Sequence, residues 1–479
     1  MNKMPHPLIS LIPLITLIGL ISASIWMFGS DALLGSSQIS LLFSTALCIV
    51  ISTGIYKYPW KAFEEEVAKT IGNTAIAIII LLLIGMLSAS WMLSGIVPTL
   101  IYHGIHIISP KFFLFMTCLI CALVSVMTGS SWTTIATIGV ALMGMGEALG
   151  ISVAWTAGAI ISGAYFGDKI SPLSDTTILA SSSAGTELFT HIRYMLFTTI
   201  PSFTFTLIIF FIAGLALSGN GETHVTEYTS HLASTFNISL WTLIIPIITA
   251  ILILKKVPSP VTLFASSLMC AVCALILQRD ILFTIAGDHN SLSLLKGIII
   301  MFSTSTTLDT GSQAVNDLVA TNGMSGMLNT VWLIVCAMIF GSVMVASQML
   351  QSITMTILKY VRSTLGLVSS TIGSGLLMNI ATGDQFLSII ITANMYKKAY
   401  KDMNLENRLL SRTTEDGVTV TSVLIPWNTC GLTQSTVLGV STLSYLPFCF
   451  FNYISPLMSI LIASTGWKIY HTDKNMAKK

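Results

Sequence analysis

The sequence is built from apolar runs that are long enough to cross a bilayer. A transmembrane helix needs about 20 predominantly apolar residues. Runs of this kind occur at residues 8–28, 38–56, 72–98, 152–180, 194–217, 237–254, 260–277, 328–350, 412–432 and 438–463. Charged residues make up only 9% of the chain, whereas a soluble protein carries about 25%. The sequence therefore predicts an all-α polytopic membrane protein with about ten full spans.

Two further apolar regions, residues 111–149 and 365–400, are each interrupted by a short polar cluster. The clusters read TGSSW (Thr128–Trp132) and TGDQF (Thr382–Phe386). Thr-Gly followed by polar residues is typical of a turn. Irregular backbone at membrane depth is tolerated only where protein or water surrounds it. We expect two re-entrant helical hairpins whose tips end inside the membrane; two pairs of short spans are the alternative.

The stretch Gly163–Ala180 combines a bilayer-length run with charges and a proline. It contains Asp168, Lys169, Pro172 and Asp175. A charge at the centre of a membrane helix costs about 2.5–3.5 kcal/mol, so such residues usually face a cavity or a partner. Proline removes a helical N–H and clashes with the preceding turn. The pattern predicts a broken helix over 152–180, whose freed oxygens form a site for a small cation.

The two halves of the chain share these polar landmarks. A shift of 254 positions aligns Thr128-Gly129 with Thr382-Gly383, Gly163 with Gly417 and Pro172 with Pro426. The second broken helix then falls at 412–432, where IPWNTCG (Ile425–Gly431) corresponds to SPLSDTT (Ser171–Thr177). We interpret residues 1–217 as a first half-repeat, 218–236 as an outer loop and 237–479 as a second half-repeat. Chance similarity between apolar segments is the alternative.

The distribution of positive charge predicts the orientation of the chain. Lysine and arginine are concentrated at residues 57–69, 255–256, 359–412 and 468–479. Residues 218–236 and 304–330 contain neither. Because positively charged loops remain in the cytoplasm, both termini are predicted to be cytoplasmic. The two hairpins then open to opposite sides, so the halves would form an inverted repeat with a binding site near the midplane.

The runs GSSWTTIATIGVALMGMG (Gly129–Gly146) and AGAIISGAYFGDKISPLSDTT (Ala157–Thr177) resemble the NhaC family of Na⁺/H⁺ antiporters, part of the wider ion-transporter superfamily. The resemblance is dense over these segments, and the two-half layout extends it to the whole chain. It implies exchange of Na⁺ for H⁺ across the bacterial inner membrane, paired re-entrant hairpins, elevator-like movement and a homodimer. Some relatives in this family instead exchange malate for lactate, or carry amino acids.

At matching positions the resemblance implies one Na⁺ site formed by the first tip and the first break. The implied ion-binding residues are Thr128, Gly129, Ser130, Ser131, Ser174, Asp175, Thr176 and Thr177. Asp175 is the main candidate for Na⁺ ligation and proton exchange, because Na⁺ and H⁺ compete for the same oxygen lone pairs. Asp168 is the candidate proton relay. The alternatives are a helix N-cap role for Asp175 and a buried ion pair between Asp168 and Lys169.

The second half departs from the first at the corresponding positions. The residues of this second site, for substrate or ion, are Thr382, Gly383, Asp384, Gln385, Asn428 and Thr429. It is a substrate site, a weaker ion site or a structural remnant. Glu415 and Asp416 open the next apolar run, close to Arg408 and Arg412. We expect them to mark a helix N-terminus with local ion pairing.

These observations favour a Na⁺/H⁺ antiporter that works by alternating access, with Na⁺ and H⁺ as transported ions and no cofactor. The alternative is a Na⁺/H⁺-coupled exchanger of a small carboxylate, of the malate/lactate type, or of an amino acid. Neither a P-loop nor a zinc-binding HExxH motif occurs in the sequence, which disfavours an ATP-driven pump and an intramembrane metalloenzyme. The cysteines lie mostly within apolar runs, so we predict neither a disulfide nor a cysteine metal site.

Overall fold

The computed structural model describes residues 4–29, 32, 35–217 and 222–472. Eight helices in this part of the chain are long and apolar enough to cross a membrane, and the number rises to 10 if each of two bent helix pairs is one span. By length and composition, these candidate spans are α1 (Pro7–Phe28), α2 (Ser36–Gly54), α3 (Trp60–Leu93), α5 (Phe113–Thr128), α10 (Leu188–Leu217), α13 (Ser259–Leu277), α17 (Leu328–Ala346) and α19 (Thr364–Thr382). The predicted all-helical polytopic membrane protein is confirmed.

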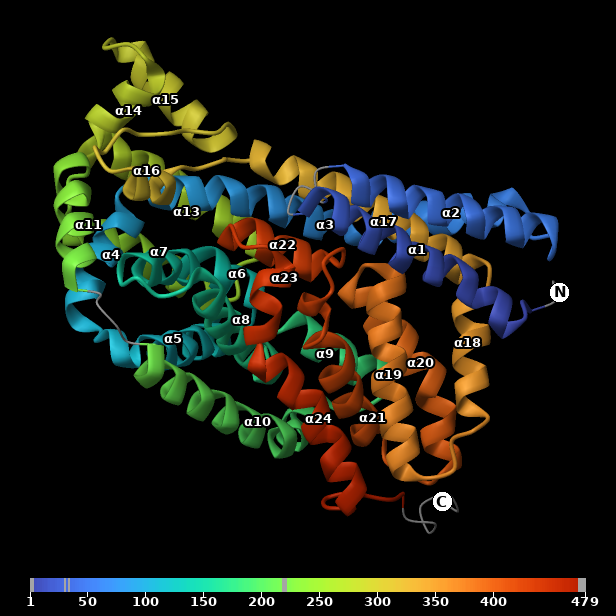
Figure 1. The fold of residues 1–479 in the computed structure, drawn as a ribbon. Helices are drawn as coiled ribbons and strands as arrows, with labels where there is room; N and C mark the ends of the chain where they lie inside the picture. The colour runs from blue at the N-terminus through green and yellow to red at the C-terminus, as the bar shows by residue number, and fades with distance from the viewer. Residues whose placement is uncertain (1–3, 30–31, 33–34, 218–221, 473–479) are drawn as a thin grey trace.

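The bent pairs and several shorter helices complete the fold. One bent pair joins Tyr228–Thr235 of α11 (Glu222–Thr235) to Leu240–Leu254, which ends in α12 (Ile244–Leu254), with a bend of 88°. The other joins Thr442–Phe448, which begins with α23 (Thr442–Tyr445), to α24 (Phe450–Thr465), with a bend of 55°. The shorter helices include α4 (Ile96–Ile107), α14 (Arg279–Ala286), α15 (Ser291–Ser303), α16 (Gln313–Val319) and α18 (Met349–Leu358). Helices α14 and α15 form an arm that projects from the body (Figure 1).

Each of the two expected hairpin regions is divided by a glycine turn. In the first, α5 is followed by α6 (Ser131–Thr134), a π-helical turn η3 (Ile135–Gly139) and α7 (Val140–Ala148). In the second, α19 is followed by α20 (Gln385–Asp402), and these two helices lie side by side (Figure 1). Gly129 and Gly383 occupy the turns with φ of 68° and 64°, a left-handed conformation that glycine adopts without strain.

Two discontinuous helices follow the hairpins. Helix α8 (Val153–Ile170) ends before the SPLS segment, and α9 (Asp175–Ala184) continues after it. In the second half, α21 (Asn407–Thr414) passes through the π-helical turn η6 (Glu415–Thr419) and the short 3₁₀ turn η7 (Ser422–Leu424) before α22 (Thr429–Leu438) begins. Helix α21 begins 254 positions after α8 begins. Helix α22 likewise begins and ends 254 positions after α9.

Glycines allow α5 and α8 to pack closely. A Cβ atom at Gly163 would lie 2.1 Å from the carbonyl oxygen of Cys118, and one at Gly167 would lie 2.5 Å from the backbone nitrogen of Val126. The backbones of the two helices are therefore almost in contact, as small residues permit in membrane helix pairs. This contact places the end of α8 beside the first hairpin tip.

Gly163→Ala is expected to destabilise the protein by about 1–3 kcal/mol, because the new methyl group would force α5 and α8 apart. Thermal unfolding of the purified protein in detergent measures the change. Gly72→Ala is the matched control, since Gly72 lies in α3 with no heavy atom within 4 Å of the added Cβ. Equal stability of the two variants would contradict the close packing.

Several segments differ from their predicted bounds. Helix α3 begins at Trp60 and not at 72, because its charged first turns extend beyond the apolar run and carry the pairs Lys61–Glu65 and Lys69–Glu66. It ends before Gly95, where a φ of 85° separates it from α4. The predicted outer loop 218–236 contains α11, and its first four residues lie outside the described part of the chain.

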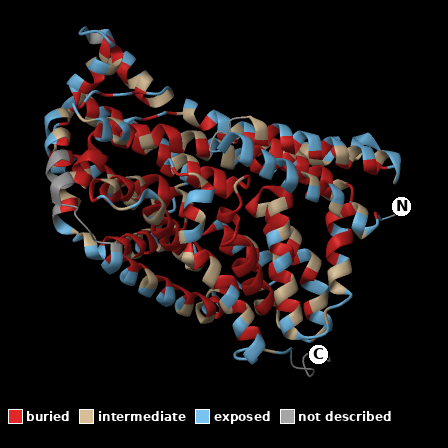
Figure 2. Ribbon diagram, in the orientation of Figure 1, coloured by how far each residue is buried: buried red, intermediate tan, exposed pale blue. Residues whose placement is uncertain are grey.

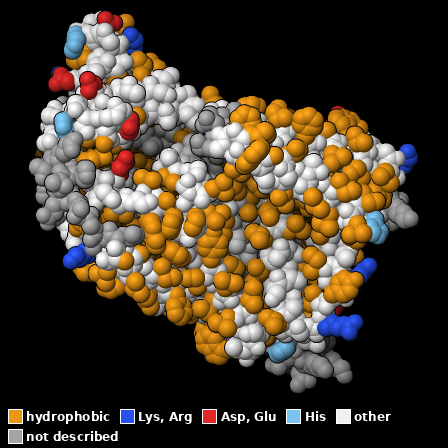
Figure 3. All heavy atoms as spheres, viewed as in Figure 1, with side chains coloured by type: hydrophobic (Ala, Val, Ile, Leu, Met, Phe, Trp, Pro, Cys, Tyr) orange, Lys and Arg blue, Asp and Glu red, His pale blue; other side chains and the backbone are white. Residues whose placement is uncertain are grey.

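Burial is concentrated at the centre of the molecule, in α8, α9, α21 and α22 (Figure 2). The face shown in Figure 3 carries a broad apolar band with charged side chains mostly at its margins. Exposed Phe205 and Ile212 on α10, and Ile276 on α13, belong to this outer apolar surface. The polar discontinuous helices are thus enclosed by helices with apolar outer faces.

Candidate functional site

A cavity of about 440 Å³ lies where both hairpin tips meet the first helix break. Its polar and aromatic lining comprises Thr128, Ser130, Trp132 and Thr133 from the first hairpin; Asp168, Asp175 and Thr176 from the first discontinuous helix; Asp384, Gln385 and Phe386 from the second hairpin; Thr70, Asn73 and Thr74 from α3; and Ser259 from α13. Segments more than 200 positions apart in the sequence therefore share one cavity. Three of these side chains are carboxylates.

Asp168 joins the first tip to the first break. The Ser131 hydroxyl donates a hydrogen bond of 2.7 Å to its Oδ2, and the Ser174 hydroxyl donates one of 2.6 Å to its Oδ1. The carboxylate is buried near the end of α8. Both of its oxygens are therefore engaged by hydroxyl groups. The alternative of an ion pair with Lys169 is wrong, because that lysine pairs with Asp416.

Asp175 is the first residue of α9 and is exposed in the cavity, as well as in an adjoining one. Ser174 is the N-cap residue, and its hydroxyl accepts a hydrogen bond of 3.5 Å from the Thr177 N–H. The alternative role of Asp175 as the N-cap is therefore wrong. Its position at the helix N-terminus is still favourable for a negative charge, and its carboxylate is free to bind a solute.

The two hairpin tips have the same local hydrogen-bond pattern. In the first tip, Thr128 Oγ1 accepts from the Ser130 N–H at 3.3 Å and lies 3.1 Å from Thr134 Oγ1. In the second tip, Thr382 Oγ1 accepts from the Asp384 N–H at 3.3 Å and lies 2.8 Å from the hydroxyl of Ser388. Ser388 is 254 positions after Thr134. The side chain of Ser130 then caps α6 in the first tip, and the side chain of Asp384 caps α20 in the second.

Asp384 differs chemically from its counterpart Ser130. Its Oδ1 accepts a hydrogen bond of 2.8 Å from the Leu387 N–H, and the Thr429 side chain lies close by. Its Oδ2 is buried without a hydrogen-bond partner among the described residues. The second tip therefore places a carboxylate group in the cavity lining at the position where the first tip has a hydroxyl group.

The other residues of the predicted second site make contacts within the protein. The Thr429 N–H donates to the Gly383 carbonyl at 2.8 Å, and the Asn428 amide donates to the Asn379 carbonyl at 3.2 Å. Gln385 Oε1 accepts a hydrogen bond of 3.2 Å from Ser422 and another from the Cys430 thiol. These bonds hold the second tip against the second break.

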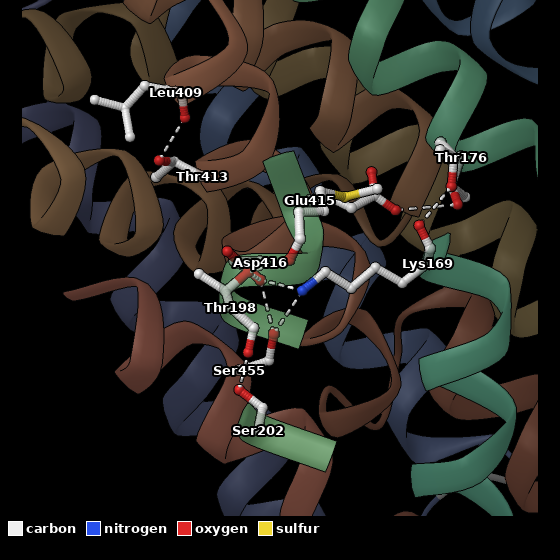
Figure 4. A network of polar contacts seen from close by, with 11 residues as sticks. Lys169, Thr176, Thr198, Ser202, Leu409, Thr413, Glu415, Asp416 and Ser455 are labelled. Atoms are coloured by element: carbon white, nitrogen blue, oxygen red, sulfur yellow. Dashed lines mark hydrogen bonds and ion pairs between the residues drawn. The ribbon is translucent and has the colours of Figure 1, made fainter. Parts of the chain in front are cut away.

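A buried ion pair connects the two halves of the molecule. Lys169 Nζ on α8 donates to Asp416 Oδ1 on η6 and to the Ser455 hydroxyl on α24, the latter at 2.9 Å (Figure 4). Ser455 also donates to Asp416 Oδ1 at 2.7 Å, and Thr198 on α10 donates at 3.4 Å. The side chains of both charged residues are fully buried. The network fixes η6 against the end of α8.

The expectation that Glu415 and Asp416 mark a helix N-terminus with local ion pairing is wrong. Both are fully buried in the π-helical turn, whereas Arg408 pairs with Glu406 and the Arg412 guanidinium stacks on the ring of Tyr194 at 4.5 Å. The sequence did contain a signal for this burial, namely the free-energy cost of placing charged residues in an apolar run. Two acids in an apolar run need a partner as much as the Asp168-Lys169 pair does.

A chain of hydroxyl groups links Asp168 to Glu415. Ser174 Oγ lies 2.6 Å from Asp168 Oδ1 and 2.9 Å from Thr176 Oγ1, which lies 3.3 Å from Glu415 Oε1. Each hydroxyl has one hydrogen to donate, so two hydroxyls cannot supply three hydrogen bonds. A complete chain requires a third hydrogen on one of the two carboxyl groups. The geometry therefore suits two carboxyl groups that share one proton.

Bilayer-length helices around a polar cavity built from two interrupted hairpins and a broken helix define a secondary transporter. The sequence profile of the Na⁺/H⁺ antiporter family matches residues 6–187 and 163–467. The chain belongs to this family. The resemblance to its NhaC members is also confirmed by the relatives that follow.

Three relatives match most of the chain. The Na⁺/H⁺ antiporter NhaC of Bacillus subtilis is 34% identical over 423 residues, which are 88% of this chain and 91% of the relative. The malate-2H⁺/Na⁺-lactate antiporter of Bacillus subtilis is 35% identical and covers 92% of each chain. The arginine/ornithine antiporter ArcD of Halobacterium salinarum is 33% identical and covers 97% of this chain and 93% of the relative.

Proposed function

We propose that this protein is a Na⁺/H⁺ antiporter of the bacterial inner membrane that works by alternating access. The observation that carries the proposal is the shared cavity, in which Asp168 and Asp175 meet hydroxyl groups of the first tip and first break. Hard oxygen ligands of this kind suit Na⁺. The family's Na⁺/H⁺ exchange supports the same conclusion.

Within this proposal, Na⁺ binds to the oxygens that face the cavity at the first tip and first break. Thr128, Ser130 and Asp175 face the cavity, and Gly129 has only its backbone oxygen to offer. Ser131 and Ser174 instead orient Asp168, while the Thr177 hydroxyl donates to the carbonyl groups of residues 168 and 169 at 3.2 and 3.0 Å. Competition between Na⁺ and H⁺ for Asp175, with Asp168 as the relay, couples the two ions.

The two halves, residues 1–217 and 237–479, are proposed to be inverted repeats that exchange conformations and expose the cavity to either side in turn. Equal spacing of the discontinuous helices and the matching hydrogen bonds of the tips support this proposal. Both termini would then be cytoplasmic, and a homodimer is proposed from the family resemblance. The ion gradient supplies the energy, so transport needs no nucleotide or redox cofactor.

Reconstituted exchange tests the proposed function. The purified protein in proteoliposomes is expected to take up ²²Na⁺ against an imposed proton gradient without any organic solute. Parallel vesicles receive malate, lactate or amino acids. A strict requirement for one of these solutes would replace Na⁺/H⁺ antiport by the alternative, a coupled exchanger of a small carboxylate or an amino acid.

Asp175→Asn is expected to reduce Na⁺/H⁺ exchange by about a hundredfold or more, because an amide neither carries the exchanged proton nor supplies a negative ligand. Proton-driven ²²Na⁺ uptake measures the loss, and an unchanged elution profile and unfolding temperature show that the variant folds. Asp288→Asn, on the exposed arm, is the control with an unchanged rate. Full transport by the Asp175 variant would remove this residue from its proposed role.

A further inference from the structure

The cavity is much larger than a sodium ion requires. A water molecule takes about 30 Å³ of liquid, whereas the cavity measures about 440 Å³. This volume lies in the range of about 300–1,000 Å³ that is usual for small-molecule sites. The space between the two tips therefore suits an organic solute of about the size of an amino acid or a short diamine.

The charge of the lining defines what kind of solute fits. Asp175 is exposed in the cavity, and Asp384, with 2% of its surface exposed, has a carboxylate oxygen without a partner among the described residues. Among the described residues that line the cavity, none is lysine or arginine. Lys256 lines the adjoining cavity, which also contains Asp175. The main cavity is therefore a site of negative charge.

Two further features favour a cationic organic group. The aromatic residues Trp132 and Phe386 also line the cavity, and aromatic side chains can attract an ammonium or guanidinium group. The N-termini of α9 and α20 could attract an anion in principle. However, Ser174 and Asp384 already cap these helices, and Asp175 adds a second negative charge beside them.

We propose that the cavity binds a small organic cation, with its ammonium or guanidinium group between Asp384 and Asp175, in competition with Na⁺. The proposal rests on the proposed antiport in one respect: both solutes would occupy the same alternating-access cavity. A dicarboxylate such as malate is disfavoured, because it would lie against these two carboxylates with no lysine or arginine among the described lining residues.

Direct binding to the purified full-length protein tests this proposal independently of transport. The probes are putrescine and arginine, with malate and lactate as anionic controls, and the readouts are ²²Na⁺ displacement and the shift in unfolding temperature. Putrescine or arginine is expected to displace ²²Na⁺ and raise the unfolding temperature, whereas malate and lactate do neither. Displacement by malate or lactate, or by none of the four probes, would overturn the proposal.

Variants locate the binding group. Asp384→Asn is expected to weaken binding of the organic cation by about tenfold to a hundredfold, as expected for loss of a charged hydrogen-bond partner. Asp384→Glu keeps the charge and should retain binding. Glu147→Gln is the matched control, because this half-buried carboxyl group on α7 lies outside the cavity lining. Equal binding by the Asn and Glu variants would exclude Asp384. Na⁺/H⁺ exchange by the wild-type protein is measured in a separate assay. Absence of exchange there would contradict the proposed antiport, whereas the binding assay alone decides on the organic cation.

Discussion

Lys169→Met is expected to destabilise the protein by about 3–5 kcal/mol, the usual cost of removing one partner of a buried ion pair. The substitution leaves the Asp416 carboxylate in the interior, with only the hydroxyl groups of Ser455 and Thr198 as donors. The same change removes the bond that holds η6 to α8, while the Ser455 hydroxyl still joins η6 to α24. Thermal or denaturant unfolding in detergent, followed by circular dichroism, measures the loss.

Two comparisons isolate the ion pair as the cause. The double variant Lys169→Met/Asp416→Leu is expected to regain much of the stability, because it removes both buried charges. Lys296→Met acts on the exposed pair Lys296–Asp288, at 4.0 Å, and should change stability by less than about 1 kcal/mol. If Lys169→Met were as stable as Lys296→Met, the buried pair would not hold the halves together.

Glu415→Gln is expected to reduce Na⁺/H⁺ exchange by about a hundredfold while Na⁺/Na⁺ exchange continues. A glutamine does not accept and release the third hydrogen that the chain through Ser174 and Thr176 requires, and a positioned acid–base group typically contributes a hundredfold or more. Lys169, Asp416 and Asp168 face the same region, so the wild type and variant are compared over a range of pH. Both rates are measured with ²²Na⁺ in proteoliposomes.

Substitutions at Thr176 distinguish a proton path from a role in Na⁺ binding. Thr176→Val removes the hydroxyl that joins Ser174 to Glu415, whereas Thr176→Ser keeps it. We expect the valine variant to lose Na⁺/H⁺ exchange and the serine variant to retain it. If the valine variant lost Na⁺/Na⁺ exchange to the same extent, Thr176 would act as a Na⁺ ligand and the proposed chain would be wrong.

The tips and breaks could be predicted from the sequence because their signals are local. A Thr-Gly turn followed by a capping residue defines Gly129 and Gly383, and Pro172 falls between α8 and α9. The shared 254-residue spacing also predicted where the second break would fall, and α22 begins and ends 254 positions after α9. Composition was sufficient for the polytopic class, since only 9% of the residues are charged, whereas a soluble protein carries about 25%.

The buried charge network could not be predicted because its partners are distant in the sequence. Lys169 and Asp416 are brought together by the packing of α8 against η6 and α24. Sequence proximity instead suggested Arg408 and Arg412 as partners of the acidic pair. In the structure Glu415 and Asp416 lie in a π-helical turn, fully buried, with Asp416 bonded to the first half of the chain.

Alternating access to the cavity is tested most directly by the labelling of a single cysteine at Leu173→Cys. Leu173 lines the cavity, and the native cysteines are buried except Cys273, which is partly buried, so the parent protein gives the background. In oriented proteoliposomes, a membrane-impermeant thiol reagent is expected to label this cysteine from either side, and saturating Na⁺ should slow the labelling. Labelling from one side alone, unaffected by Na⁺, would contradict a cation cavity that opens alternately to the two sides.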